Sequence, residues 1–241
     1  MLSALKFKLQ CVLAPKPSHP ILLDYQQAAL ALTLKPSDQQ GAKQSQLQLC
    51  LRELPLMAID LETTGLDPNT EQIVSIGLVP IYGAEIPLAK AQHRTVAING
   101  GVGNSATFHG LSDSALAKGM ALDEAMAWFI TESRGHILVA HNAPLDLGFI
   151  QVQFERLYQS PCPLPFIDTL AIAKRRWLSQ HSVLKQDCLR LDACRKRHGL
   201  PTYAAHSAQI DALACAELLV AQMAAIAGKD KLSPWQLLQF A

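Results

Sequence analysis

The sequence predicts an α/β protein in which helices flank a mixed sheet. Three short segments with the composition of strands follow one another between residues 54 and 98. From residue 122 onward, segments with a helical apolar stripe alternate with short apolar segments typical of buried strands. Successive strands followed by alternation indicate a mixed sheet. The 241 residues are 49% hydrophobic and 17% charged, with 13 glycines and 14 prolines, which excludes an intrinsically disordered or collagen-like chain.

The first 54 residues differ from the rest and predict a small helical N-terminal extension. Three prolines at 15–20 exclude a long helix in the opening segment. Residues 22–33 have the helical spacing of leucine, tyrosine and alanine, and residues 46–54 predict a second amphipathic helix. We expect this extension to be a packing appendage, with a partner-binding arm as the alternative.

Residues 55–228 are predicted to form the main domain. Its strands are expected at 54–60, 72–81, 93–98 and 136–142, with a short strand that begins at 165. Its helices are expected at 122–134, at 144–158, within 165–178, at 182–199 and at 207–227. Residues 229–241 are expected to form a C-terminal tail, in which a serine and a proline start a short helix.

Cysteine spacing and hydropathy bear on the compartment of the protein. The six cysteines form no CxxC pair and follow no disulfide framework, so we expect reduced thiols. Lys6, Lys8 and Gln10 interrupt the opening apolar residues, which makes a poor signal peptide. We find no uninterrupted apolar run of about 18 residues and expect no membrane association. These observations favour a cytoplasmic protein.

Two carboxylates, Asp60 and Glu62, end the first strand of the main domain. Side chains at i and i+2 project from the same face of a strand, so both can point at one spot. Carboxylates held together at the end of an apolar strand repel each other, and a divalent cation removes that repulsion. Taken alone, such a pair is more often a turn acid beside a solvated one.

Three further residues have chemistry that could join this pair. Asp146 lies in the first turn of a helix that follows a buried strand, where an acid alone is often a partner of the helix dipole. His206 and Asp211 are five residues apart, which is about 140° around a helix, so they cannot share a helical face. We therefore expect His206 at or just before the start of the last long helix, folded back toward Asp211.

The order of these residues resembles the DEDDh 3′–5′ exonucleases, a family that includes the epsilon subunits of DNA polymerase III, ribonuclease T and oligoribonuclease. The motifs that carry the resemblance are DLETTGLD (60–67), FHGLSD (108–113), HNAPLDLGF (141–149), IDTL (167–170) and HSAQIDA (206–212). The spacing HxxxxD in the last motif is that of the histidine branch. Leu145 departs from the aromatic residue that many members have before the acid of the second motif. The resemblance implies a ribonuclease H-like fold over roughly residues 54–225.

The resemblance also implies roles for individual residues. Four acids would hold two divalent metal ions, Mg²⁺ or Mn²⁺, and His206 would take the proton of the attacking water, which makes the catalytic set Asp60, Glu62, Asp146, Asp211 and His206. The candidate substrate contacts are Thr63, Thr64, Leu66, Phe108, His109 and Asn142.

Charge divides unevenly along a chain whose formal net charge is only +1. Residues 56–170 carry 5 basic and 12 acidic side chains, whereas residues 171–200 carry 8 and 2. The basic segment precedes His206 and could hold the phosphate backbone of an incoming strand. The alternative is two solvated helix faces.

The function that this resemblance implies is release of nucleoside monophosphates from the 3′ end of single-stranded DNA, in proofreading or repair and with a DNA polymerase as the candidate partner. The first alternative is an exonuclease of the same fold that trims RNA or short oligonucleotides. The second is a non-catalytic module that binds nucleic acid or supports a polymerase. The complete set of four acids and one histidine favours an active enzyme.

Overall fold

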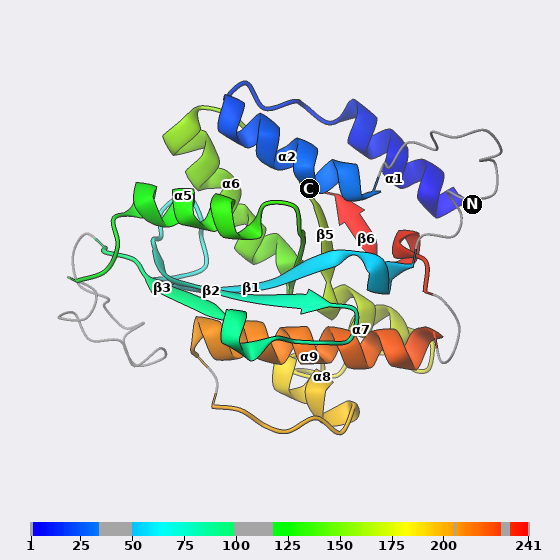
Figure 1. Ribbon diagram of the computed structural model, residues 1–241. Helices are drawn as coiled ribbons and strands as arrows, with labels where there is room; N and C mark the ends of the chain where they lie inside the picture. Colours follow the sequence, from blue (N-terminus) through cyan, green and yellow to red (C-terminus); the bar gives the residue numbers. More distant parts are fainter. Residues whose placement is uncertain (1, 34–49, 99–117, 205, 228–231, 241) are drawn as a thin grey trace.

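The computed structural model describes residues 2–33, 50–98, 118–204, 206–227 and 232–240. Within these ranges the protein has three layers, with a mixed sheet between two layers of helices (Figure 1). This is the α/β architecture that the sequence predicts.

The sheet has six strands in the described part of the chain, in the order β3-β2-β1-β4-β5-β6. They are β1 (Pro55–Thr63), β2 (Ile73–Tyr82), β3 (Gln92–Thr95), β4 (Ile137–Ala140), β5 (Pro165–Asp168) and β6 (Leu238–Phe240). β1, β4 and β5 are parallel neighbours, whereas β2, β3 and β6 run antiparallel to the strands beside them. The sheet is therefore mixed, with β1 at its centre.

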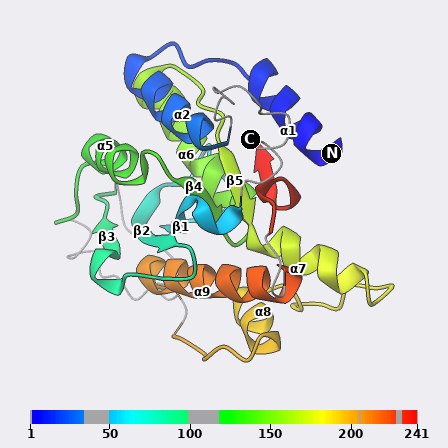
Figure 2. The same ribbon diagram turned by 45° about the vertical axis from the view of Figure 1, so that its right-hand side comes forward.

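Helices cover both faces of the sheet. One face is covered by α2 (Pro20–Thr33), α5 (Leu122–Ser133) and α6 (Ala143–Tyr158). On the other face α9 (Ala208–Ala227) lies across the strands, flanked by α7 (Thr169–Leu178) and α8 (Leu191–Arg197) (Figures 1 and 2). The helix α1 (Leu2–Leu13) lies beside β6.

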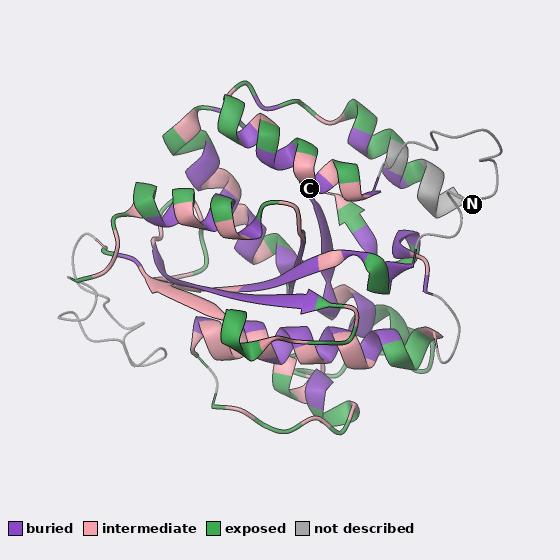
Figure 3. Cartoon of the chain, in the orientation of Figure 1, coloured by how far each residue is buried: buried purple, intermediate pink, exposed green. Residues whose placement is uncertain are grey.

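Alternation along β1 decides which way its side chains point. Met57 and Ile59 enter the core shared with α2, α5 and α6. Leu56 and Ala58 enter a second core, shared with α9. β2 is accordingly buried along almost its whole length, and β1 is buried from Leu56 to Ile59 (Figure 3). Because side chains alternate between faces, the next residues of the second set, Asp60 and Glu62, project on the side of α9.

The N-terminal helices share these two cores. Tyr25 of α2 is fully buried, and its hydroxyl group lies 2.7 Å from the Ser133 hydroxyl of α5. Phe7 of α1 packs against Trp235 at a ring-centroid distance of 5.5 Å. The opening helix is not a long one: α1 has 12 residues, an average length, and ends at Leu13, before the first of the three prolines. The sequence did not predict α1.

Three other expected helices differ from the structure. The described end of the 46–54 segment forms only a 3-10 turn at Leu51–Glu53, because a residue before proline, here Leu54, is disfavoured in α conformation. Of the expected helix at 182–199, only α8 forms. In the C-terminal tail the expected helix is a 3-10 turn, Pro234–Gln236, and β6 follows it. A three-residue strand is too short to show a period of two.

Carbonyl groups that precede α8 have partners outside a helix. Trp177 Nε1 donates to the Val183 carbonyl at 2.9 Å, and the Leu189 carbonyl lies 2.8 Å from His141 Nε2. These contacts hold the segment in an irregular path, so the apolar spacing at 182–190 does not produce a helix.

The helix α9 is long and apolar enough, by length and composition, to cross a membrane, with a mean hydropathy of 1.7. The sequence shows no uninterrupted apolar run here, because Asp211 and Glu217 lie within the helix. Nine of its residues are buried in the structure, where it packs on β1 and β2. Burial in the core accounts for its composition.

Candidate active site

The candidate site lies where β1 extends beyond its neighbour β4. The parallel pairing with β4 includes Leu56, Met57 and Ala58 and goes no further. β2 accompanies β1 to its end, with a register shift between Glu62 and Thr63. The last residues of β1 are therefore held firmly on one side and open on the other, which leaves room for a functional site.

Three carboxylates meet at this end of β1. Asp60, Glu62 and Asp211 each offer one oxygen atom, and these atoms all lie within 4.8 Å of one another. Two of the acids come from β1 and the third from the first turn of α9, about 150 residues later. The structure thus brings together the first motif, DLETTGLD, and the last motif, HSAQIDA.

Gly77 allows α9 to approach so closely. It lies opposite Asp60 in the pairing of β1 with β2. A Cβ atom at this position would be 2.2 Å from the Ala208 carbonyl oxygen, so any side chain would collide with the start of α9. The missing side chain lets the helix lie directly on the strand and puts Asp211 beside Asp60.

Asp146 is placed next to the three acids by its position in the first turn of α6. Its Oδ1 accepts a hydrogen bond of 3.1 Å from the Leu61 amide, which β4 is too short to pair. Leu61 lies between Asp60 and Glu62, so this contact joins the second motif to the first. The side chain is buried, in a helix turn where the dipole favours an acid.

Burial raises the pKa values of all four acids, and the charges of neighbouring carboxylates raise those of Asp60, Glu62 and Asp146 further. Burial raises the pKa of Asp60 well above its usual range, and the charges of Asp146, Asp211 and Glu62 raise it further. Burial, with Asp211 nearby, raises the pKa of Glu62 to about 7. Burial also raises the pKa of Asp146 to about 7, although the Leu61 amide acts against this shift.

Burial alone raises the pKa of Asp211, while the amide groups of His206 and Ser207 and the charges of His206 and Arg195 oppose the rise. The raised pKa values of all four acids show that the metal-free site stabilises negative charge poorly. Clustered carboxylate oxygens are the ligands that Mg²⁺ and Mn²⁺ prefer, and such an ion would remove the repulsion. The residues present therefore fit a divalent cation.

His206 lies two residues before α9, as its spacing from Asp211 predicts. Its amide group donates to Asp211 Oδ2 at 2.8 Å, and its backbone adopts a left-handed φ of 72°. The side chain is exposed and lines a cavity of about 460 Å³ together with Asp60 and Asp211. The imidazole and the carboxylates therefore face one shared space.

A buried arginine braces the segment that leads to His206. Arg195 is 3% exposed, and its Nη2 lies 2.7 Å from Glu217 Oε2 and 2.9 Å from the Pro201 carbonyl oxygen. Tyr203 donates to the other oxygen of Glu217 at 2.9 Å and lies under the guanidinium group. The sequence placed Arg195 only in a basic segment, and no local pattern indicates this role.

His141 is a second residue that the sequence analysis did not single out, although it opens the second motif. It lines the same cavity, and its Nδ1 lies 2.8 Å from Thr169 Oγ1. Its Nε2 lies 2.8 Å from the Leu189 carbonyl oxygen, and burial lowers its pKa. It joins the end of β4 to the segment before α8.

The predicted substrate contacts have varied positions. Thr63 Oγ1 donates to the Gly65 carbonyl at 2.6 Å, and Thr64 Oγ1 bonds to Glu71, so both hydroxyl groups serve the turn after β1. Leu66 is 78% exposed at the tip of that turn.

Asn142 has a φ of 75°, and its backbone N–H donates to the buried carboxylate of Asp168 at 3.0 Å. Its side chain makes no capping hydrogen bond to α6. Phe108 and His109 lie outside the described residues.

Comparison with known proteins agrees with this arrangement. The family profile described as Exonuclease matches residues 57–219. The chain is 30% identical over 186 residues to the PolC-type DNA polymerase III of Thermotoga maritima, covering 76% of this chain but only 13% of that protein. It is 28% identical to the DNA polymerase III subunit epsilon of Treponema pallidum, covering 69% of this chain and 75% of the relative.

Solved structures have the same fold. Exonuclease X, in complex with 5′ overhanging duplex DNA, superposes with a TM-score of 0.55 at 22% identity, covering 70% of this chain and 92% of that one. The nuclease domain of 3′hExo, a DEDDh family member bound to rAMP, superposes with a TM-score of 0.57 at 16% identity, covering 77% of this chain and 98% of that one. Because the family match covers residues 57–219, well over half of the chain, the chain belongs to the exonuclease family, as a DEDDh 3′–5′ exonuclease.

Proposed function

We propose that this protein releases nucleoside monophosphates from the 3′ end of single-stranded DNA by two-metal hydrolysis. The observation that carries the proposal is the cluster of Asp60, Glu62 and Asp211, of which Asp60 and Asp211 line the same cavity as His206. A phosphodiester is an anion, so water attacks it only where charge is neutralised and a base accepts the proton. The carboxylates could hold the cations that neutralise charge, and His206 could accept the proton.

The residues of the site would divide the work as follows. Asp60, Glu62 and Asp211 would hold divalent cations, with Asp146 as the fourth ligand. Bound Mg²⁺ or Mn²⁺ supplies Lewis acidity toward the phosphate and lowers the pKa of water. His206 would accept the proton of the attacking water at its imidazole, since histidine is the side chain suited to proton transfer near neutral pH.

DNA is proposed as the substrate because the relatives aligned over most of this chain are named as DNA polymerase III proteins. For the same reason we propose a DNA polymerase as partner. A cytoplasmic location is proposed from the six cysteines, all of which lie in the described ranges without a disulfide. We also propose the division into residues 1–54, 55–228 and 229–241. It divides the sequence and not the packing, because α1 and α2 share the cores of the main domain.

The test uses purified protein with 5′-labelled single-stranded DNA and RNA of one sequence, in Mg²⁺, Mn²⁺ or EDTA. We expect stepwise shortening from the 3′ end, faster on DNA, that EDTA and Asp60→Asn abolish. Asp67→Asn is the matched control, because Asp67 is exposed in the turn after β1 and its side chain bonds within that turn, to Asn69 and Thr70. Activity that survives EDTA would reject the metal mechanism, and faster cleavage of RNA would favour the RNA-trimming alternative. Absence of cleavage would favour a non-catalytic module.

A further inference from the structure

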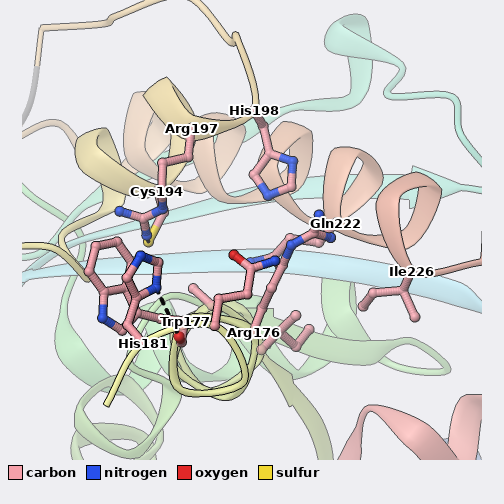
Figure 4. Close-up of a pocket in the computed structure, with 11 residues that line it drawn as sticks. Arg176, Trp177, His181, Cys194, Arg197, His198, Gln222 and Ile226 are labelled. Atoms are coloured by element: carbon pink, nitrogen blue, oxygen red, sulfur yellow. Dashed lines mark hydrogen bonds between the residues drawn. The ribbon is translucent and has the colours of Figure 1, made fainter. Parts of the chain in front are cut away.

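A second cavity, of about 260 Å³, lies between α7, α8 and α9 (Figure 4). α7 contributes Arg176 and Trp177, the end of α8 contributes Arg197 and His198, and α9 contributes Gln222. The two basic stretches of the segment 171–200 therefore meet in one cavity, although about twenty residues separate them in the sequence.

The cavity has an excess of positive charge. Among its described lining residues none is acidic, and within the described ranges neither Arg176 nor Arg197 has a carboxylate within ion-pair distance. Arg197 donates instead to the Cys188 carbonyl at 2.6 Å and to Cys194 Sγ at 3.1 Å. Two guanidinium groups that face one space without a counter-ion favour an anion, and their forked geometry suits phosphate.

The cavity also has an aromatic wall and an unsatisfied acceptor. His181 stacks on Trp177 with ring centroids 4.1 Å apart, and the Arg197 guanidinium lies 5.3 Å from the Trp177 ring centroid (Figure 4). Gln222 is 2% exposed and donates to the Thr169 carbonyl, while its Oε1 has no hydrogen-bond partner among the described residues. A nucleotide has the matching parts, namely a phosphate, a flat base and N–H donors.

Helix α8 separates this cavity from the acidic site. Arg195 lines the acidic side, whereas Arg197 and His198 line the other. Asp211 and Gln222 are eleven residues apart on α9, which corresponds to about 16 Å along the helix. At a stacked spacing of about 3.4 Å, this is roughly five nucleotides.

We propose that the cavity between α7, α8 and α9 binds a nucleotide phosphate of the same strand whose 3′ end occupies the acidic site, about five nucleotides from that end. The proposal rests on the proposed exonuclease function. It assigns Arg176 and Arg197 a role in strand length preference and leaves the chemical step to the acidic site.

The test compares two double variants that remove the same charge. R176Q/R197Q changes the cavity, whereas K174Q/K196Q changes exposed neighbours on the same helices that do not line it. We measure kcat and KM on single-stranded DNA of 3 and 12 nucleotides. R176Q/R197Q should raise KM for the 12-mer about tenfold and leave kcat, and KM for the 3-mer, unchanged. The slope of log KM against log salt concentration should decrease by the amount that corresponds to about one or two lost phosphate contacts. The lysine control should change KM less than twofold.

Equal effects of the two double variants, or equal effects on both lengths, would overturn the proposal. Binding of a fluorescent nucleoside monophosphate distinguishes a free nucleotide from the strand. If only R176Q/R197Q loses that binding while the 12-mer KM stays unchanged, the cavity serves a free nucleotide and the strand path is wrong. If R176Q/R197Q does not fold, as judged by melting, R176Q alone replaces it, since the Arg176 side chain is exposed and its one hydrogen bond to the described residues is 3.5 Å long.

Failure of the proposed function remains distinguishable. If the wild-type protein cleaves neither oligonucleotide, equilibrium binding of both lengths to the D60N variant in EDTA still measures the contribution of the cavity. Length-dependent binding that R176Q/R197Q abolishes supports the cavity without catalysis, and length-independent binding contradicts it.

Discussion

The two halves of the acidic site are held in different ways. Asp60 and Glu62 project from β1, which is paired with β2 along its whole length and tied at Leu61 by the carboxylate of Asp146. His206 lies outside any regular element, exposed and with a left-handed backbone. The difference teaches that Asp60 and Glu62 are positioned by the sheet itself, whereas His206 is positioned by side chains around its loop.

This difference predicts separate consequences for stability and turnover. Residues of the carboxylate half are costly to bury, so their removal should stabilise the metal-free protein while destroying activity. Residues that brace the histidine half should affect turnover and stability together. Each prediction below tests this distinction, beginning with the largest expected effect.

Asp60→Asn should lower kcat by at least about 10³-fold, since one carboxylate of the cation cluster is lost. The same change should raise the melting temperature of the metal-free protein by about 2–4 °C, because a buried and repelled charge disappears. Exonuclease assays and melting curves in EDTA measure the two effects. A variant that is less stable and still active would contradict the assignment of the carboxylate half.

His206→Ala should lower kcat by about 10²- to 10⁴-fold, the range of general base catalysis, with little effect on cation affinity or melting temperature. His136→Ala is the matched control, since His136 precedes β4, whose first residue pairs with Leu56 at the end of β1 away from Asp60. Normal turnover of His206→Ala at neutral pH would reject the proton-transfer role.

Arg195→Met should destabilise the protein by about 3 kcal/mol, because it leaves Glu217 without its buried partner. It should also lower kcat about tenfold and alter the pH profile of kcat, with KM little changed, since the segment before His206 loses its brace. Arg190→Met is the control, an arginine of the same cavity whose ion pair with Asp187 is exposed. An unaltered pH profile would reduce Arg195 to a purely structural role.

Gly77→Ala should destabilise the protein by about 1–3 kcal/mol, because the new Cβ collides with the first turn of α9. Cation affinity should fall with it, as Asp211 moves away from Asp60. Gly148→Ala in α6 makes ordinary contact at 3.6 Å and should stabilise by about 0.5–1 kcal/mol. Chemical denaturation of both variants measures this opposition, and equal effects of the two would show that α9 does not depend on the missing side chain.

Much of the carboxylate half could be predicted from the sequence, because it depends on local periodicity. Alternation in β1 puts Asp60 and Glu62 on one face, and helical geometry places His206 before the helix that carries Asp211. The family resemblance then joined these residues to Asp146. The match to the exonuclease profile confirms the family.

Contacts between distant segments could not be predicted. The charge of Arg195 indicated a basic segment, yet the side chain turns inward to Glu217, while Arg197 on the same helix faces a different cavity. The absent side chain of Gly77 has meaning only once α9 lies on it. The strand β6 depends on pairing with β5, and its three residues are too few to show an alternating pattern in the sequence.

The most direct test of the account is the melting temperature of the protein between pH 4.5 and 8, in EDTA and in Mn²⁺. The pKa values of Glu62 and Asp146 are raised to about 7, above those of unfolded carboxylates near 4, so the folded state binds more protons in this range. The stability of the metal-free protein should therefore fall as pH rises from about 4.5 through 7. Mn²⁺ should reverse this loss near neutral pH in the wild type and not in Asp60→Asn. A melting temperature that Mn²⁺ leaves unchanged at pH 7.5 would contradict a cation site in the carboxylate cluster.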